Sequence, residues 1–321
     1  GLVGRVERHQ ETENMTQTPD TSRNFLAVTA VAAPSNADLA GQLGEILAAA
    51  GVDDMKLRIL SHAGPLQACE YVFEAGSRQE TEAVRAGVRA LEADIAILPA
   101  ANRRKRLLIS DMDSTIIGQE CLDELADFAG LKAEVSAITE RAMRGELDFE
   151  GALTTRVAML KGLELSALEA AYRERITLNP GARTLTATMK AHGAHALLVS
   201  GGFTFFTSRV AEASGFDAHR GNTLTDDGAV LMGDVGRPIL GREAKLAALD
   251  DAAAAHGLVR DDALALGDGA NDLDMIRAAG LGIAYRAKPI VAEQAAAAIN
   301  HTDLTAALFF QGYTADEFVT S

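Results

Sequence analysis

The sequence predicts an α/β protein with a Rossmann-like parallel sheet, an all-helical insertion after the first strand of that sheet, and an N-terminal α+β domain. Three observations support this fold class. From residue 107 onward, short unbroken apolar runs alternate with helical segments, as in a parallel sheet that is covered by helices on both faces. Residues 119–179 show a helical pattern only. Residues 25–100 contain four strand-like runs and two helical segments in a different order.

The composition of the chain argues against several classes of partner. Its 321 residues include 30 Lys plus Arg against 45 Asp plus Glu, a net charge of −15. This balance argues against nucleic acid and against an anionic membrane surface as binding partners. It does not argue against a small anionic substrate, because the binding of such a substrate depends on the local charges of its pocket. No apolar run approaches the ~18 residues of a membrane span. Two cysteines in unrelated contexts, Cys69 and Cys121, are typical of free thiols in a reducing compartment, so we expect a cytoplasmic protein.

The N-terminal part of the chain is predicted to contain a polar tail and a small α+β domain. Residues 1–24 lack the apolar core of a signal peptide, and we interpret them as a disordered tail, an expression remnant or an over-extended start. Residues 25–100 follow the order β-α-β-β-α-β of a ferredoxin-like domain, which resembles the ACT-type regulatory domains. The expected strands are 25–33, 55–61, 68–75 and 93–98, and the expected helices are 36–50 and 81–91.

Residues 106–118 and 180–321 are predicted to form the α/β core, and residues 119–179 a helical cap. A plain βα connection takes only ~2–6 residues, so this long helical insertion is predicted to be a separate unit. The basic segment 103–106 is expected to be a solvated linker or the start of a strand. A β-hairpin is expected within residues 218–235. The expected core strands are 107–110, 196–199, 263–266 and 281–284.

Chemically informative residues follow three of these strands. Asp111 and Asp113 come after the first, Ser200–Gly202 after the second, and Gly267–Asp272 after the third. Lys245 lies on a predicted helix between the last two segments. Ligands of open α/β sheets bind beyond the carboxyl ends of the strands, so we expect these residues to meet at one edge of the sheet.

The acidic residues among them predict a site for a hard cation. Asp111 and Asp113 alone would be more typical of an Asx-turn or a helix cap. The Gly-x-Gly at 267–269 resembles a dinucleotide loop, but Asp272 stands where a third glycine is needed, which argues against such a site. Close carboxylates repel each other, so either a cation bridges them or one carries a proton. Together with Asp268, these acids suit Mg²⁺.

Two further features predict that an anion binds at the same edge. Ser200–Gly202 offers a hydroxyl and backbone N–H groups at a helix N-terminus, although a plain strand-to-helix turn would explain the segment alone. Lys245 offers a point charge for phosphate, although a single lysine is usually on a solvated helix face. Carboxylates that suit a metal, N–H groups and a lysine together describe a phosphoryl-transfer site.

In order and spacing, these motifs resemble those of the haloacid dehalogenase-like (HAD) phosphatases. The similarity is greatest to the phosphoserine phosphatases, because of the segments 111–121 and 142–149 and of Arg156. It covers about residues 106–318, and the N-terminal domain is consistent with bacterial members that carry an ACT-like domain. The resemblance implies Mg²⁺-dependent hydrolysis of O-phospho-L-serine to serine and phosphate through an aspartyl-phosphate intermediate, the final step of serine biosynthesis.

The resemblance also implies roles for the residues at the strand ends. Asp111 would be the nucleophile, and Asp113 the general acid and then the general base. Mg²⁺ would be held by Asp111, Asp268 and the backbone carbonyl of Asp113, with Asp272 supporting the metal through water. The phosphoryl oxygens would be bound by Ser200, Gly201, Lys245 and Asn271.

The serine moiety would be bound by residues of the helical insertion and its entrance. Arg156 suits a carboxylate, because a guanidinium can pair with both oxygens, and Glu120 would bind the amino group. Met143 and Phe149 would close the pocket. Without the resemblance, Glu120 and Arg156 would be interpreted as surface residues, and Met143 and Phe149 as packing residues.

Two alternatives are left open. The first is a phosphotransferase or phosphatase for another small amino-acid phosphate such as phosphohomoserine, although the Glu120–Arg156 pair favours an α-amino acid. The second is a non-catalytic amino-acid sensor built around residues 25–100, against which the pair Asp111 and Asp113 argues. The expected partner is the small-molecule substrate, with no nucleic acid and no membrane. A homodimer and a serine effector at the N-terminal domain are compatible with this interpretation.

Overall fold

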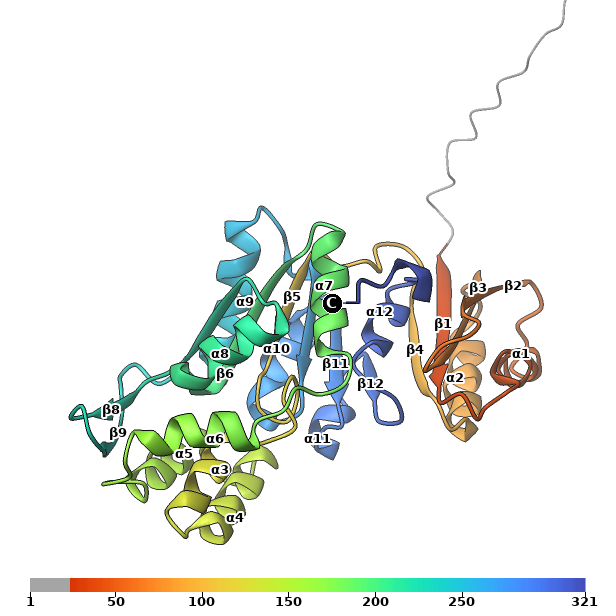
Figure 1. The fold of residues 1–321 in the computed structure, drawn as a ribbon. Coiled ribbons are helices and arrows are strands. Elements are labelled where there is room, and N and C mark those ends of the chain that lie inside the picture. Colours follow the sequence, from red (N-terminus) through yellow and green to blue (C-terminus); the bar gives the residue numbers. More distant parts are fainter. Residues whose placement is uncertain (1–23, 321) are drawn as a thin grey trace, which may run out of the picture.

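The computed structural model describes residues 24–320, so the tail predicted for residues 1–24 lies almost entirely outside the described part of the chain. Ten strands form one continuous sheet in the order β2-β3-β1-β4-β12-β11-β10-β5-β6-β7. The predicted α/β class is confirmed: most of the central strands are parallel, and helices cover them (Figure 1). Within residues 24–320, no helix is both long and apolar enough to cross a membrane.

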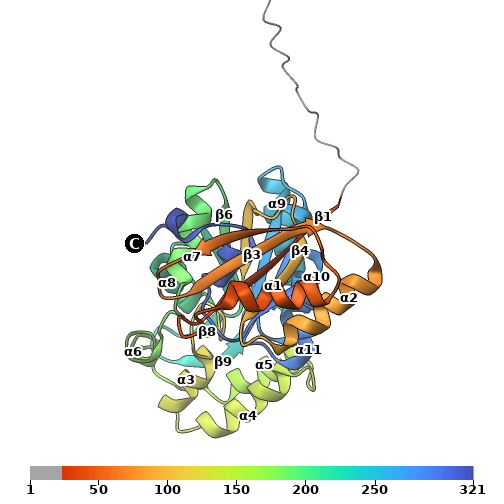
Figure 2. The same ribbon diagram turned by 90° about the vertical axis from the view of Figure 1, so that its right-hand side faces the viewer.

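The N-terminal part has the predicted β-α-β-β-α-β order. Its strands pair antiparallel as β2-β3-β1-β4, and α1 and α2 cover the face that is turned toward the viewer in Figure 2. Alternate residues of β1, such as Val28 and Ala30, pack with Leu43 and Leu47 of α1. The elements are β1 (Phe25–Ala32), α1 (Leu39–Ala49), β2 (Met55–Ser61), β3 (Gln67–Glu74), α2 (Arg78–Gly87) and β4 (Asp94–Pro99).

The parallel part of the sheet is covered on both faces. Alternate residues of β5 belong to different cores: Leu108 packs on the side of α7, α8 and α12, and Leu107 packs on the side of α9 and α10. The strands are β5 (Leu107–Ser110), β6 (His195–Phe203), β7 (Ala218–Asn222), β10 (Ala263–Gly267), β11 (Leu281–Tyr285) and β12 (Ala297–Ile299). The helices are α7 (Ala182–Ala191), α8 (Thr204–Ser214), α9 (Arg242–Ala255), α10 (Leu273–Ala278), α11 (Pro289–Ala292) and α12 (Ala306–Phe310).

Two strands of this sheet differ from the sequence prediction. Residues 218–222 form β7, which pairs with β6 in the main sheet rather than with the hairpin. The hairpin consists only of β8 (Leu224–Asp226) and β9 (Leu231–Val235). β12 was not predicted, because three residues give no recognisable apolar run. β7 is mostly polar, and only its last residue, Asn222, is buried, so it too lacks the apolar signal of a core strand.

Four helices lie between β5 and α7 and form a layer beneath the carboxyl edge of the sheet in Figure 1. They are α3 (Cys121–Phe128), α4 (Lys132–Met143), α5 (Phe149–Ala158) and α6 (Ser166–Arg175). The β8–β9 hairpin is attached to this layer by backbone hydrogen bonds, since the amide of Gly162 donates to Leu231 O and the amide of Leu231 donates to Leu163 O, both at 2.8 Å. The layer and the hairpin therefore form one wall opposite the sheet edge.

The N-terminal strands are joined to the core by a buried polar interface. Glu70 on β3 is fully buried, and its carboxylate accepts hydrogen bonds from Arg103 Nη1 at 2.6 Å and from Arg58 Nη1 at 2.5 Å. The prediction that segment 103–106 is solvated is therefore wrong for Arg103, whose side chain is 9% exposed. Lys105 is also buried, and its ammonium donates to two backbone carbonyls. The charges of this segment hold the two parts together.

Replacing Asp94 with alanine is expected to destabilise the protein. Asp94 at the start of β4 is 2% exposed, and its carboxylate accepts hydrogen bonds from the amides of residues 300–302 and from the hydroxyl of Thr302, at 2.6–3.0 Å. Because the variant leaves buried donors without an acceptor, it should lower the free energy of unfolding by about 3 kcal/mol. Chemical denaturation measures the loss. The exposed Asp53→Ala variant is the control, and equal stability of the two variants would contradict this account.

Candidate active site

Asp111 and Asp113 lie on the loop that continues β5. The amide of Asp111 donates to Leu266 O at 3.0 Å, which extends the β5–β10 pairing by one residue. The Asp111 carboxylate is almost fully buried and accepts a hydrogen bond from the amide of Met112 at 2.8 Å. Asp113 has a buried carboxylate oxygen, Oδ1, without a hydrogen-bond partner among the described residues. The loop therefore presents two carboxylates at the edge of the sheet.

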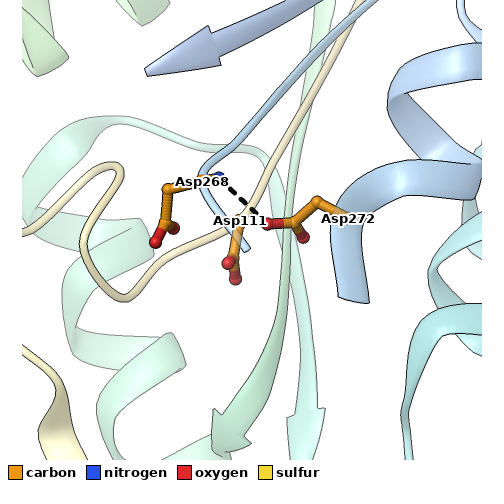
Figure 3. Close-up of side chains that lie close together, drawn as sticks. All are labelled: Asp111, Asp268 and Asp272. Atoms are coloured by element: carbon orange, nitrogen blue, oxygen red, sulfur yellow. Dashed lines mark hydrogen bonds between the residues drawn. The ribbon is translucent and has the colours of Figure 1, made fainter. Parts of the chain in front are cut away.

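Asp111, Asp268 and Asp272 form a buried acidic cluster, in which one oxygen of each side chain lies within 4.8 Å of the others (Figure 3). Asp272 Oδ2 accepts hydrogen bonds from the amides of Asp268 and Gly269 at 3.0 and 3.1 Å. Lys245 Nζ lies 2.6 Å from Asp272 Oδ1 and 2.9 Å from Asp111 Oδ1. Because both Asp272 oxygens are engaged, this residue orients the loop and the lysine, while Asp111 and Asp268 retain oxygens that are free to bind a ligand.

The cluster is short of positive charge. Burial, reinforced by Asp272, raises the pKa of Asp111 to about 8 although Lys245 opposes the shift. Burial also raises the pKa values of Asp113 and Asp268 well above their usual range. Burial disfavours the Lys245 ammonium, but Asp111 and Asp272 outweigh this effect and raise its pKa. One ammonium among so many carboxylates fits a site completed by a divalent cation with oxygen ligands, such as Mg²⁺.

Ser200, Gly201 and Gly202 line the same pocket as Asp113. The sequence predicted this segment at a helix N-terminus, but β6 continues through Phe203 and α8 begins at Thr204, so the three residues extend the strand. Ser200 Oγ accepts a hydrogen bond from the amide of Gly202 at 2.8 Å. A Cβ on Gly202 would lie 3.2 Å from Asp113 Oδ2, which shows how closely the backbone approaches the carboxylate.

The helical layer supplies the other wall of the site. Arg156 on α5 is 4% exposed. Glu120, immediately before α3, accepts a hydrogen bond from Ser114 Oγ at 2.6 Å, and burial raises its pKa to about 7. Phe149 lies close to Gly201 on β6, and Met143 lies close to Gly269 after β10. A Cβ on Gly201 would lie 2.5 Å from Phe149 Cζ, and one on Gly269 would lie 2.6 Å from Met143 Sδ. A side chain at Gly201 or Gly269 would therefore have to displace Phe149 or Met143.

One pocket between the sheet edge and the helical layer brings most of the predicted residues together. Lys245, Asp268 and Asp272 are not on its surface; Lys245 and Asp272 are linked to it through the Asp111–Lys245–Asp272 contacts. The pocket volume is about 30 Å³, room for about two water molecules. In this conformation the pocket has no room for a phosphorylated amino acid. The predicted residues that line the pocket are Asp111, Asp113, Glu120, Met143, Phe149, Arg156, Ser200, Gly201 and Asn271.

Several residues of the site were missed by sequence reasoning. Leu122, Leu153 and Phe203 line the pocket, but apolar residues on helices and strands carry no signal that separates them from the core. Thr115 Oγ1 donates a hydrogen bond to Asp268 Oδ1 at 2.9 Å. Because Thr115 follows Asp111 and Asp113 so closely in the sequence, its place in the site could have been predicted. Asn222 Nδ2 donates to Gly201 O at 2.8 Å, and nothing in its sequence context indicates this contact.

A profile of the haloacid dehalogenase-like hydrolases matches residues 108–277, and the chain belongs to this family. Within the curated proteins, the chain is 49% identical over 204 residues to the phosphoserine phosphatase of Polaromonas sp., covering 62% of this chain and 86% of that protein. A HAD family hydrolase from Salmonella enterica serovar Typhi has a similar structure, with a TM-score of 0.78 at 29% identity over 89% of this chain and 98% of that chain. A phosphoserine phosphatase with a phospho-aspartyl intermediate analogue gives a TM-score of 0.62 at 40% identity, covering 64% and 99%.

Proposed function

We propose that this protein hydrolyses O-phospho-L-serine to L-serine and phosphate. The observation that carries the proposal is the pocket, which has Asp111 and Asp113 on one wall and Glu120 and Arg156 on the other. The first pair suits phosphoryl transfer, and the second suits the amino and carboxylate groups of an amino acid. The phosphoserine phosphatase from Polaromonas, at 49% identity, supports the same substrate.

The proposed reaction uses two carboxylates in sequence. Asp111 Oδ attacks phosphorus, and the serine oxygen leaves with a proton from Asp113, which yields an aspartyl-phosphate. Asp113 then takes a proton from a water molecule that attacks the same phosphorus, which releases phosphate and restores Asp111. The raised pKa of Asp113 favours the protonated form that the first step requires. Ser200, Gly201, Lys245 and Asn271 are proposed to bind the phosphoryl oxygens.

Mg²⁺ is the proposed cofactor, held by Asp111, Asp268 and the Asp113 carbonyl, with Asp272 supporting it. When bound, it would neutralise charge that develops on the phosphoryl group. Chelation with EDTA is expected to lower turnover by at least about 100-fold, since such neutralisation contributes several kcal/mol. Added Mg²⁺ should restore the rate and raise the melting temperature. Full activity in protein shown by metal analysis to be free of divalent cations would contradict this assignment.

Release of serine and phosphate in equal amounts from phosphoserine and Mg²⁺ is the direct test of the reaction. The alternative acceptor is examined by adding homoserine to the same reaction. Hydrolysis predicts that phosphate release is unchanged and that no phosphohomoserine forms. Formation of phosphohomoserine at the expense of phosphate would instead identify the protein as a phosphotransferase.

The N-terminal domain, a dimer and a cytoplasmic location complete the proposal. The ferredoxin-like order of residues 25–99 supports an ACT-like regulatory role with serine as effector, and a homodimer is the expected assembly. Serine titration against activity, with sedimentation to measure assembly, tests both.

Two buried free thiols, Cys69 and Cys121, support a reducing compartment. Burial raises the pKa of Cys69 to about 12, which keeps this thiol unreactive.

A further inference from the structure

Three helices of the cap layer meet at one buried hydroxyl. Thr139 on α4 is 3% exposed, and its Oγ1 accepts a hydrogen bond from Arg156 Nη1 of α5 at 2.8 Å. The same hydroxyl lies 2.6 Å from Asp123 Oδ1 of α3. Arg156 Nε also donates to Ala152 O, one turn earlier on its own helix, at 3.0 Å. The arginine that faces the pocket is therefore fixed at two of its nitrogens, once by its own backbone and once by a side chain of a neighbouring helix.

The direction of these hydrogen bonds follows from the donors that are present. A threonine hydroxyl has one hydrogen to donate and can accept with its lone pairs, whereas a guanidinium can only donate. Thr139 must therefore accept from Arg156 and donate its own hydrogen elsewhere. The backbone carbonyl of Val135 lies 3.1 Å away, but the Asp123 carboxylate at 2.6 Å is closer and charged, which makes it the stronger acceptor. The chain of contacts runs from Arg156 through Thr139 to Asp123.

The Thr139 hydroxyl lies between Arg156 and Asp123, and it leaves more guanidinium N–H groups free than a direct ion pair between these two residues would. A carboxylate placed on the guanidinium would occupy two parallel N–H groups, which are the groups that a substrate carboxylate needs. Thr139 takes one hydrogen of Nη1 and Ala152 O takes the hydrogen of Nε, so three of the five guanidinium N–H groups remain available. Asp123 still attracts the guanidinium charge from a greater distance. Asp123 and Glu120 both favour the charged form of Arg156, against the burial that lowers its pKa. Arg156 is thus oriented and kept charged, and it retains N–H groups on Nη1 and Nη2 for a substrate carboxylate.

We infer that Asp123 and Thr139 are positioning residues, which hold Arg156 for the substrate carboxylate and so set the preference for phosphorylated amino acids over phosphate esters that lack a carboxylate. This inference rests on the proposed function, because it assigns the carboxylate of phosphoserine to Arg156. Neither residue lines the pocket that holds Asp111 and Arg156. Both line a neighbouring cavity, together with Glu120, Met143 and Asp268. Their hydrogen bonds reach the catalytic pocket at Arg156, so an effect through positioning should appear only with a substrate whose carboxylate Arg156 contacts.

The test compares Thr139→Val, which removes the hydroxyl at nearly constant shape, with Thr139→Ser, which keeps it. Both are measured with Mg²⁺ on O-phospho-L-serine and on phosphoethanolamine, the same ester without the carboxylate. Loss of a hydrogen bond to a charged group predicts that Thr139→Val raises KM for phosphoserine by about 10-fold or more. We expect kcat for phosphoserine and kcat/KM for phosphoethanolamine to change by less than about 2-fold, and Thr139→Ser to recover the wild-type KM. Thr155→Val is the matched control, since it removes an exposed hydroxyl from the helix of Arg156.

Each outcome separates this inference from the proposed function. Wild-type protein that prefers phosphoserine, with the preference unchanged in Thr139→Val, would overturn the positioning role alone. An equal rise of KM for both substrates would also overturn it, because it would show a general effect on the cap. Wild-type protein that turns over phosphoethanolamine at least as well as phosphoserine would overturn the proposed function itself. Where thermal melting shows that Thr139→Val does not fold, Asp123→Asn takes its place, with the same selective rise in KM expected.

Discussion

Asp111→Asn is expected to abolish phosphate release from phosphoserine while the protein remains folded. The amide keeps the shape of the side chain but removes the nucleophilic oxygen that would form the aspartyl-phosphate. Loss of a nucleophile that acts together with an acid–base partner lowers kcat by about 10⁴-fold or more. The measurement is the rate of phosphate release at saturating phosphoserine and Mg²⁺, with Asp53→Asn, an exposed aspartate, as control.

The same variant should not lose stability in metal-free buffer. Burial and the neighbouring Asp272 both raise the pKa of Asp111, so its charged form is unfavourable in the fold. A neutral amide removes this repulsion, as expected for active sites that are organised for function rather than for stability. The melting temperature without metal should therefore equal or exceed that of the wild type. A variant that retains activity, or one that unfolds, would contradict the role assigned to Asp111.

Lys245→Met is expected to remove activity and also to destabilise the protein strongly. Lys245 is fully buried, and its ammonium lies 2.9 Å from Asp111 Oδ1 and 2.6 Å from Asp272 Oδ1. Methionine fills a similar volume but leaves the buried Asp272 carboxylate without its cation, which costs about 3–5 kcal/mol. Chemical denaturation in metal-free buffer measures this loss. The matched control is Lys161→Met at an exposed position, where less than about 0.5 kcal/mol is expected.

A second substitution distinguishes charge from packing as the cause. Combining Lys245→Met with Asp272→Asn removes the unpaired charge of Asp272, so part of the lost stability should return. Recovery in the double variant would show coupling between the two contacting residues, as in a double-mutant cycle. Strictly additive losses would show that Lys245 contributes packing alone, contrary to the electrostatic account.

The acidic residues of the site could be predicted because they follow the ends of parallel strands. β5 and β10 are short, fully buried and apolar, and their neighbours along the chain are therefore brought to one edge by the topology alone. Ser200 was located for the same reason, but the extension of β6 through Phe203 was not, because Gly201 and Gly202 look like a turn in the sequence. Conformation at such glycines is decided by the contacts around them.

The residues that hold Arg156 could not be predicted. Thr139 and Asp123 lie on different helices, and their contact with Arg156 depends on how those helices pack, which hydrophobic periodicity does not specify. The attachment of the N-terminal strands was hidden in a similar way. Arg103 was predicted to lie in a solvated basic segment, yet its partner Glu70 lies on a strand, 33 residues earlier in the sequence. Charged residues that are buried by distant parts of the chain give no local signal.

The most direct test of the central claim is a comparison of kcat/KM for three small phosphate esters with Mg²⁺. O-phospho-L-serine carries both groups that Glu120 and Arg156 are proposed to bind, phosphoethanolamine lacks the carboxylate, and 3-phosphoglycerate lacks the amino group. A site that leaves a buried polar group unpaired rejects such analogues by about 10⁴-fold. We therefore predict that phosphoserine exceeds both by a factor of this order. Equal or faster turnover of either analogue would contradict the assignment of the protein as a phosphoserine phosphatase.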